Sequence, residues 1–385
     1  MPSVCEQVQI EYQAIKALKQ EFDSEYEKAR ETGSLAKVKE LRAILQKKRE
    51  ALVEKLWPFR EISQKEFWAR YEEETEILKN AGLLEKLPGG KLGIGESMSI
   101  NGKAYTLPGC QEVLRAMRKE KEPFDFKAGQ GLNQPLIAPF AHSIDFMAQR
   151  YGELIIQKFK EGKLLDSEGN VITDLRKQGE GDDSKNDAAG DKEYYPLWKW
   201  EKYTGADKTG QLVYFPKEFS PQNHQGQTKK QLLEKQGGFL VSLIEDLPDI
   251  PRATNDPKEI AQRTKGGRRQ LEAGQFPKDY LKLMQREKDE EGNPNPYRHE
   301  SGWTLEEWLT YAIIHLEKAG QVLDDYQGRG SVSYETGSYF PASGRVPYAY
   351  WDRGDRRASL GWHGSGRSGS DIGVRGAVRV KMLKT

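Results

Sequence analysis

Apolar residues recur at helical spacing through residues 4–56, in two runs that are separated at Gly33 and Ser34. A stripe of this period is typical of an amphipathic helix. Glycine commonly ends a helix and serine commonly caps the next, so we expect two antiparallel helices here. A third helix is predicted over 63–80. We therefore interpret residues 1–82 as a helical hairpin or stalk region, through which the chain is able to self-associate.

The pattern over residues 83–300 is mixed. Glycine-rich sequence with a short period over 83–105 predicts a small hairpin, whereas the apolar run 138–159 predicts a long core helix. The aromatic stretch 194–215 predicts strands. Residues 178–193 contain almost no large apolar side chain, and we interpret them as an exposed, mobile insertion. We expect this mixed α/β region to belong in part to the domain that follows.

Residues 301–385 begin with a clear helix signal. Thr304 and Glu307 have the spacing of a capping box, an apolar face follows, and Gly320 stands where the helix should end. Beyond this helix the chain is rich in Gly, Ser, Arg and Tyr, which predicts an irregular, loop-rich segment. The whole pattern indicates an α+β protein with a helical N-terminal region.

Composition narrows the class of protein. The chain has 385 residues, with 60 Lys and Arg against 59 Asp and Glu, a formal charge of +1. No overall field therefore attracts nucleic acid or an anionic membrane, and no specific nucleic-acid partner is expected. The sequence has no apolar run long enough to span a membrane and no secretory signal at its N-terminus. The chain is accordingly expected in the cytoplasm or on a virion.

Metal and thiol chemistry find little support in the sequence. Cys5 and Cys110 are the only cysteines, which excludes a disulfide framework and a thiolate-rich zinc site. The five histidines do not have the spacing of metal ligands. Cys110 precedes a predicted helix, and we interpret it as an ordinary buried thiol rather than a nucleophile. Neither a metal nor a cofactor is expected.

The most informative segment is 336–380, which contains no Lys, Glu, Gln or Met. One explanation is an ordinary loop region that closes a β domain. Another lies in the codons: asparagine codons randomised at their adenines become NNY codons, which cannot encode Lys, Glu, Gln, Met or Trp. They readily give Tyr, Asp, Gly, Ser, His, Arg, Val and Ala, which are the residues found here. Residues between them that such a process would leave unchanged are candidates for a fixed scaffold.

This C-terminal segment resembles the C-terminus of the variable proteins of diversity-generating retroelements. The resemblance rests on four stretches: AYWDR at 349–353, LGW at 360–362, RS at 367–368 and IGVRGAVRV at 372–380. Those proteins have a C-type-lectin fold related to the formylglycine-generating enzymes, and an error-prone reverse transcriptase rewrites the 3′ end of their genes. The resemblance implies that residues 301–385 complete a C-type-lectin-like domain with a variable region at 343–371.

We therefore predict a non-enzymatic ligand-binding protein whose partner is an unknown protein or surface ligand. The candidate variable positions, all encodable by NNY and expected to be mostly exposed on one face, are Val346, Tyr348, Tyr350, Asp352, Gly354, Asp355, Arg357, Ser359, His363, Gly364, Gly366, Gly369 and Asp371. The candidate scaffold residues between them are Trp351, Leu360, Gly361, Trp362, Ile372, Gly373, Val374 and Arg375. Arg353 and Arg375 are also candidates for scaffold ion pairs.

Two alternatives remain open. The first is a structural or interaction protein of the same fold that is not diversified. The second is an enzyme of the formylglycine-generating type, which the absence of cysteine from the C-terminal region disfavours.

Overall fold

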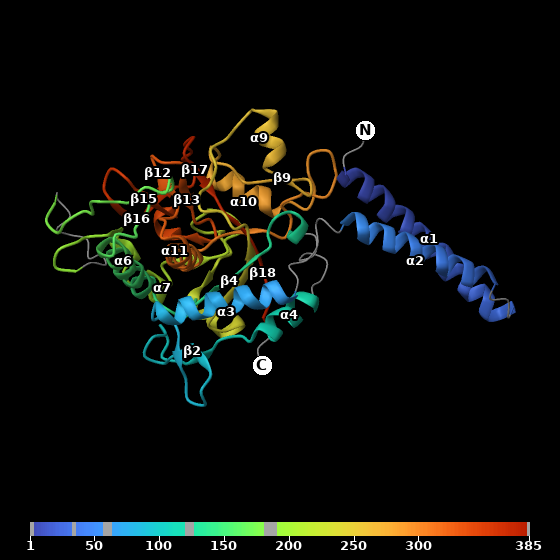
Figure 1. Cartoon of the computed structure of the whole chain (residues 1–385), viewed down its shortest axis with the longest axis horizontal. Helices are drawn as coiled ribbons and strands as arrows, with labels where there is room; N and C mark the ends of the chain where they lie inside the picture. Colours follow the sequence, from blue (N-terminus) through green and yellow to red (C-terminus); the bar gives the residue numbers. More distant parts are fainter. Residues whose placement is uncertain (1–3, 33–35, 57–63, 120–126, 181–190, 383–385) are drawn as a thin grey trace.

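The N-terminal helices form an arm. A computed structural model describes residues 4–32, 36–56, 64–119, 127–180 and 191–382. Helices α1 (Val4–Thr32) and α2 (Ala36–Leu56) lie side by side and project from the rest of the molecule (Figure 1). Val38 and Leu41 are among the few buried side chains of this pair, and Lys and Glu cover its outside. The two helices predicted from the sequence are present.

The third predicted helix, α3 (Gln64–Asn80), belongs to the body of the molecule and not to the arm. Phe67 and Leu78 are fully buried in the main core, and α3 packs against strand β4 and helix α11. Residues 1–82 are therefore not one structural unit, because the apolar face of α3 is covered by the core.

A four-stranded antiparallel sheet lies at the centre of the main core. Its order is β11 (Ser301–Gly302), β18 (Gly376–Arg379), β8 (Leu240–Ile244), β4 (Gln134–Ala138). Helix α11 (Leu305–Ala319) packs on β4, and α6 (Ile144–Lys160) packs on α11. Helix α11 has the predicted capping box: the Thr304 hydroxyl accepts a hydrogen bond from the Glu307 amide, and Gly320 ends the helix in the left-handed region.

The prediction of one helix over 138–159 is wrong at its beginning. Helix α6 begins at Ile144, where the Ser143 side chain accepts a hydrogen bond from the Phe146 amide, and the preceding apolar residues lie at the end of strand β4 and in a turn. An apolar run that is buried on all sides has no period by which a strand and a helix can be told apart.

A second, six-stranded sheet carries the C-terminal segment. Its order is β17 (Ile372–Val374), β13 (Val332–Tyr334), β15 (Arg345–Asp352), β16 (Arg357–Gly364), β5 (Leu197–Lys199), and β12 (Asp325–Tyr326) pairs in parallel with β15. The expectation of an irregular, loop-rich segment is therefore wrong for 345–364, which forms a regular hairpin. Both faces of this hairpin are packed, so the sequence does not show the simple alternation of a half-exposed strand.

The second sheet lies between two apolar clusters. On one side Ala349, Trp351 and Leu360 join the main core, which also contains α6 and α11. On the other side Val346 belongs to a smaller cluster with Tyr280 and other residues of α10 (Pro277–Gln285). This second cover decides how much of the hairpin is open to a ligand.

The remaining elements are short and complete an α+β fold. They are β1 (Glu85–Lys86), β2 (Leu92–Ile94), β3 (Tyr105–Thr106), α4 (Cys110–Lys119), η2 (Glu201–Tyr203), α7 (Ala206–Thr209), β6 (Val213–Tyr214), β7 (Gln227–Thr228), α8 (Lys229–Gln236), α9 (Pro257–Gln262), β9 (Thr264–Lys265), β10 (Arg268–Arg269), β14 (Ser338–Tyr339) and η3 (Pro341–Ser343). Over the described ranges, none of the helices combines the length and apolar content needed to cross a bilayer.

The predicted insertion at 178–193 falls largely on residues 181–190, which lie outside the described residues. Its two ends are hydrogen-bonded to each other, with the Gln178 amide donating to the Glu193 carbonyl over 2.9 Å. Glu180 also forms an ion pair with Arg356, in the turn between β15 and β16, with 2.5 Å between the Oε2 and Nη2 atoms.

Candidate functional site

The pairing of β15 with β16 sorts the candidate residues by face. Val346 pairs with His363, Tyr350 with Ser359, and Asp352 with Arg357. Directly opposite residues of an antiparallel pair share a face, and the face alternates along each strand. Seven candidate variable positions therefore lie on one face of the hairpin, which we call the variable face: Val346, Tyr348, Tyr350, Asp352, Arg357, Ser359 and His363. Trp351, Leu360 and Trp362 lie on the opposite face.

The expectation that the thirteen candidate positions are mostly exposed is wrong. Gly354 and Gly366 are exposed, whereas Val346, Arg357 and Ser359 are buried. The other eight are half-buried: Tyr348, Tyr350, Asp352, Asp355, His363, Gly364, Gly369 and Asp371.

Neighbouring elements explain this burial. The cluster with α10 covers Val346. Ser359 lies between its two pairing partners, Tyr350 on β15 and Trp198 on β5, whose side chains are much larger. The Arg357 guanidinium stacks over the ring of Tyr195, at 5.2 Å from its centroid. Only part of the variable face is therefore accessible.

An aromatic row runs along the accessible part. The rings of Tyr326 and Tyr350 are 5.4 Å apart between centroids, those of Tyr350 and Tyr348 are 5.6 Å apart, and those of Tyr348 and His363 are 4.7 Å apart. Edge-to-face and tilted contacts at these distances hold aromatic side chains in place. The row presents a large amphipathic surface. Because its side chains are already held in place, they lose little rotational freedom when a ligand binds.

The row opens into a groove of about 670 Å³ beside the end of β16, which we call the β16 groove. Its lining residues are Trp198, Trp200, Arg345, Tyr348, Trp362, His363, Gly364, Gly366 and Arg367. The Trp200 ring lies 5.0 Å from that of Trp362, and the Arg345 guanidinium stacks on Trp362 at 3.7 Å. Four candidate variable residues line this groove together with residues from outside the predicted sets.

Positive charge dominates the β16 groove. Burial and, to a smaller extent, the Arg367 and Arg345 guanidinium groups together lower the pKa of His363 to about 4, against a weaker opposing effect of the Asp371 carboxylate. The imidazole is therefore neutral near pH 7. Among the described residues that line the groove there is no Asp or Glu.

The predicted scaffold residues behave in two ways. Trp351, Leu360, Ile372, Val374 and Arg375 are buried, as is the backbone of Gly361 and Gly373. Trp362 differs from the other scaffold candidates, because it is only half-buried and lines the groove. Its ring lies between the Arg345 guanidinium and the Trp200 ring.

Arg375 and Arg353 both form ion pairs, as expected for scaffold arginines. The Arg375 Nη2 atom lies 2.6 Å from the Oδ1 atom of buried Asp324, which also accepts a hydrogen bond from the Trp308 indole over 2.9 Å. Arg353 donates to Asp325 from Nε over 2.8 Å and from Nη2 over 2.6 Å. These pairs hold the C-terminal strands to the rest of the fold.

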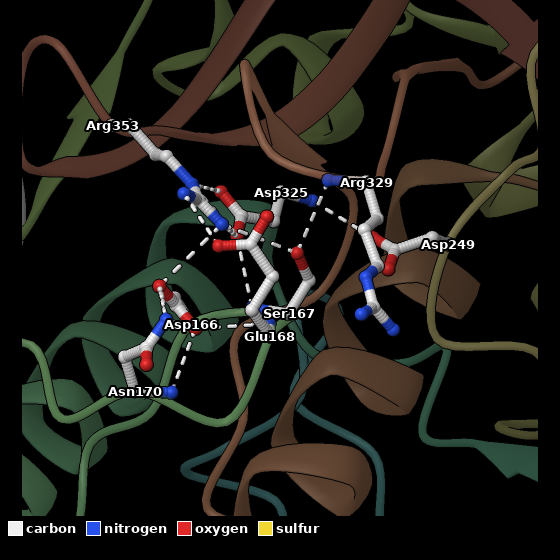
Figure 2. Close-up of polar contacts among 8 residues, drawn as sticks. All are labelled: Asp166, Ser167, Glu168, Asn170, Asp249, Asp325, Arg329 and Arg353. Carbon is white, nitrogen blue, oxygen red and sulfur yellow. Dashed lines mark hydrogen bonds and ion pairs between the residues drawn. The ribbon is translucent and has the colours of Figure 1, made fainter.

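Figure 2 shows the network around Arg353, which fixes the turn after β15. Asp325 accepts a further hydrogen bond from the Ser167 amide over 2.9 Å, and Arg353 reaches Glu168 over 3.2 Å. Asp166 is occupied by the backbone amides of Glu168 and Asn170. Across the ranges that the structure describes, no group of three or more His, Cys, Asp or Glu has an arrangement suited to a metal ion. The carboxylates of the network accept hydrogen bonds from arginine and from main-chain amides, which anchors the turn to the segment 166–170.

Cys110 is a buried thiol, as expected from the sequence. Burial raises the pKa of its thiol to about 11, so it carries no charge near pH 7. His142 is not available to activate it, because its ring nitrogens are hydrogen-bonded to the carbonyl oxygens of Met98 and Leu83.

Several residues of the groove were missed by the sequence analysis. Trp198 and Trp200 lie in the aromatic stretch 194–215, which was interpreted only as strands, and Arg345 and Arg367 lie inside the predicted variable region without being selected. Two tryptophans separated by one residue were the available signal, since an edge strand directs such a pair to one side.

Comparisons of the chain with protein-family models, curated proteins and solved structures find no match.

Proposed function

We propose that this chain is a non-enzymatic ligand-binding protein that displays diversified side chains on a C-type-lectin-like scaffold, as a variable protein of a diversity-generating retroelement. One observation carries the proposal. The two residues of β15 and β16 that NNY cannot encode, Trp351 and Trp362, both lie on the face opposite the seven candidate variable positions. A face that is rewritten beside a face that is not would produce this division.

The packing of the hairpin supports the same proposal. Strand β16 is hydrogen-bonded to β15 on one side and to β5 on the other, so its path does not depend on its side chains. The side chains of the aromatic row supply contact area at a low entropic cost, and the Gly and Ser residues beside them supply polar contacts. Antibody combining sites use the same division of roles.

The arm of α1 and α2 is proposed to serve attachment or self-association. A pair of helices covers each apolar stripe on one side only, and Tyr26 and Ile44 remain 46% and 37% exposed. Exposed apolar residues on a two-helix arm favour contact with further helices. A second copy of the arm supplies such helices.

Sequencing tests the proposal. We expect a near-copy of the 3′ end of this gene beside a reverse transcriptase gene, differing from it where the copy has adenine. Deep sequencing of the gene in a growing population should then show substitutions at codons 346, 348, 350 and 363 and none at codons 351, 361 and 362. Absence of the copy, with substitutions spread evenly, favours an interaction protein that is not diversified.

A further inference from the structure

The β16 groove has one aromatic ring that is not packed against another. Trp200 is held by three rings, those of Tyr203, Phe340 and Trp362, at centroid distances of 5.9, 5.3 and 5.0 Å. Trp198 is half-buried, and no ring contact involves it within the described ranges. The Trp200 ring is therefore held in place by its neighbours, whereas the indole of Trp198 is available to contact a ligand.

The arginines of the C-terminal segment fall into two groups. Seven occur between positions 345 and 379, and five of them form ion pairs: Arg353 with Asp325, Arg356 with Glu180, Arg357 with Asp355, Arg375 with Asp324 and Arg379 with Glu307. Arg345 and Arg367 have no carboxylate within ion-pair distance in the described part of the chain, and both line the β16 groove. These two guanidinium groups are therefore available to pair with carboxylates of another molecule.

We infer that the β16 groove binds an acidic segment of a protein partner, with carboxylates at Arg345 and Arg367 and an apolar side chain on Trp198. This inference rests on the proposed function and names the chemistry of the partner at the same face. Guanidinium groups bind carboxylates through paired hydrogen bonds, and Trp, Tyr and Arg are the residues that contribute most at protein interfaces. Neutral His363 between them adds a polar contact without reducing the positive charge.

The position of the groove favours a polypeptide over a sugar. Strand β5 is the last strand of its sheet, and Trp198 lies at its middle. The outer main-chain groups of β5 belong to Leu197 and Lys199, which are 0% and 5% exposed, so a ligand is recognised here by side chains and not by strand addition. The groove continues into the aromatic row, and this combination of Tyr, Trp and Arg is enriched at protein interfaces, which favours a polypeptide.

A selection experiment tests the inference. A displayed library of random 12-residue peptides is selected in parallel on the full-length protein and on the Arg345→Gln/Arg367→Gln variant. Peptides enriched on the wild type alone should be rich in Asp and Glu. A synthetic copy of such a peptide should bind the double variant and Trp198→Ser at least tenfold more weakly. It should bind the control Arg115→Gln/Arg286→Gln, with the same loss of charge, within twofold of the wild type, and thermal melts verify that all variants fold.

Three results would overturn the inference. They are enrichment of peptides without acidic residues, equal binding to the groove variant, and failure of any peptide to enrich. If an oligogalacturonide binds with the same dependence on the two arginines while no peptide does, the groove is a site for an acidic sugar. The genomic test is independent of this selection. If a template copy is found but no acidic peptide binds, the proposed function stands and the proposed class of partner is rejected. If acidic peptides bind but no template copy is found, the groove is a binding site on a protein that is not diversified.

Discussion

The ring of Tyr348 lies across Gly361, its pairing partner on β16. A Cβ atom at position 361 would stand 2.3 Å from both the Cζ and Oη atoms of Tyr348. Gly361 is therefore the one predicted scaffold residue of β15 and β16 that lies on the variable face, and its missing side chain is what allows the tyrosine to lie flat beside the groove. An aromatic ring over a glycine on the neighbouring strand also shields the bare backbone from water.

Gly361→Ala should destabilise the protein by about 1 to 3 kcal/mol, because the added methyl group displaces the Tyr348 ring in a packed region. Combining it with Tyr348→Ser should remove most of this loss, and urea denaturation of the two single variants and the double variant measures the coupling. Additive losses in the double variant would show that the ring and the glycine do not interact.

Trp351 and Trp362 should differ in their effect on stability. Trp351 is 2% exposed in the main core, so Trp351→Ala should lower the free energy of unfolding by about 3 to 5 kcal/mol. Trp362→Ala removes a half-buried ring and should lower it by about 1 to 2 kcal/mol, since less apolar area is lost from the folded state. Chemical denaturation compares the two. Equal losses of unfolding free energy in the two variants would show that Trp362 contributes to stability as a core residue does.

The Arg353 network should couple the turn after β15 to Asp325. Arg353→Met leaves a fully buried carboxylate without its guanidinium partner, and we expect a loss of about 2 to 4 kcal/mol. In the double variant with Asp325→Asn the loss should be smaller, because no buried charge is left unpaired. Thermal and chemical melts of the set provide the measurement, with Arg286→Gln as an exposed control. A double variant as unstable as the sum of the two would argue against the coupling.

His363 should titrate near pH 4 in the folded protein. Its pKa lies below the ordinary 6.5, so as the pH falls from about 6.5 to 4 the unfolded chain takes up a proton that the folded chain does not. The folded state therefore loses stability across this range. Proton NMR of the imidazole should show the low midpoint, and Arg367→Gln should raise it. A midpoint near 6.5 in the wild type would mean that the His363 imidazole is neither buried nor close to the two guanidinium groups.

The arm should determine the oligomeric state. If its apolar residues meet a second copy, light scattering of the full chain should give a multiple of 43.9 kDa, and Tyr26→Lys/Ile44→Glu should reduce this to the mass of one chain. Both residues are exposed, so the change leaves the contact between α1 and α2 in place. Lys19→Gln serves as a control on the exposed polar side of α1. A wild-type chain that is monomeric at all concentrations would exclude the proposal.

Strongly periodic or capped elements could be predicted from the sequence. The arm helices and α11 appear where apolar period and capping residues indicate them, because those signals are local. The β15–β16 hairpin could not, since its regularity comes from pairing with β5 and β13, which are distant in sequence. That Trp351 and Trp362 share a face follows from register, which requires knowledge of the turn.

Burial of the candidate positions was equally hidden from the sequence. Nothing in the C-terminal segment indicates that α10 packs against Val346, or that Trp198 lies beside Ser359. The groove also depends on this distant pairing, because two of its tryptophans come from the segment around β5 and the other lining residues from the hairpin and the loop after it. Spatial assembly from separate segments leaves no local pattern to detect.

The two-sided pairing of β16 has a consequence for experiment. In a binding loop, each substitution also changes the path of the chain, so affinity reports shape and chemistry together. Here the main chain is paired on both flanks at Ser359, and with β15 at His363, so a replacement at either position leaves the strand in the same direction. A series of variants at these positions therefore measures the contribution of single side chains to recognition, separately from any change in the path of the main chain.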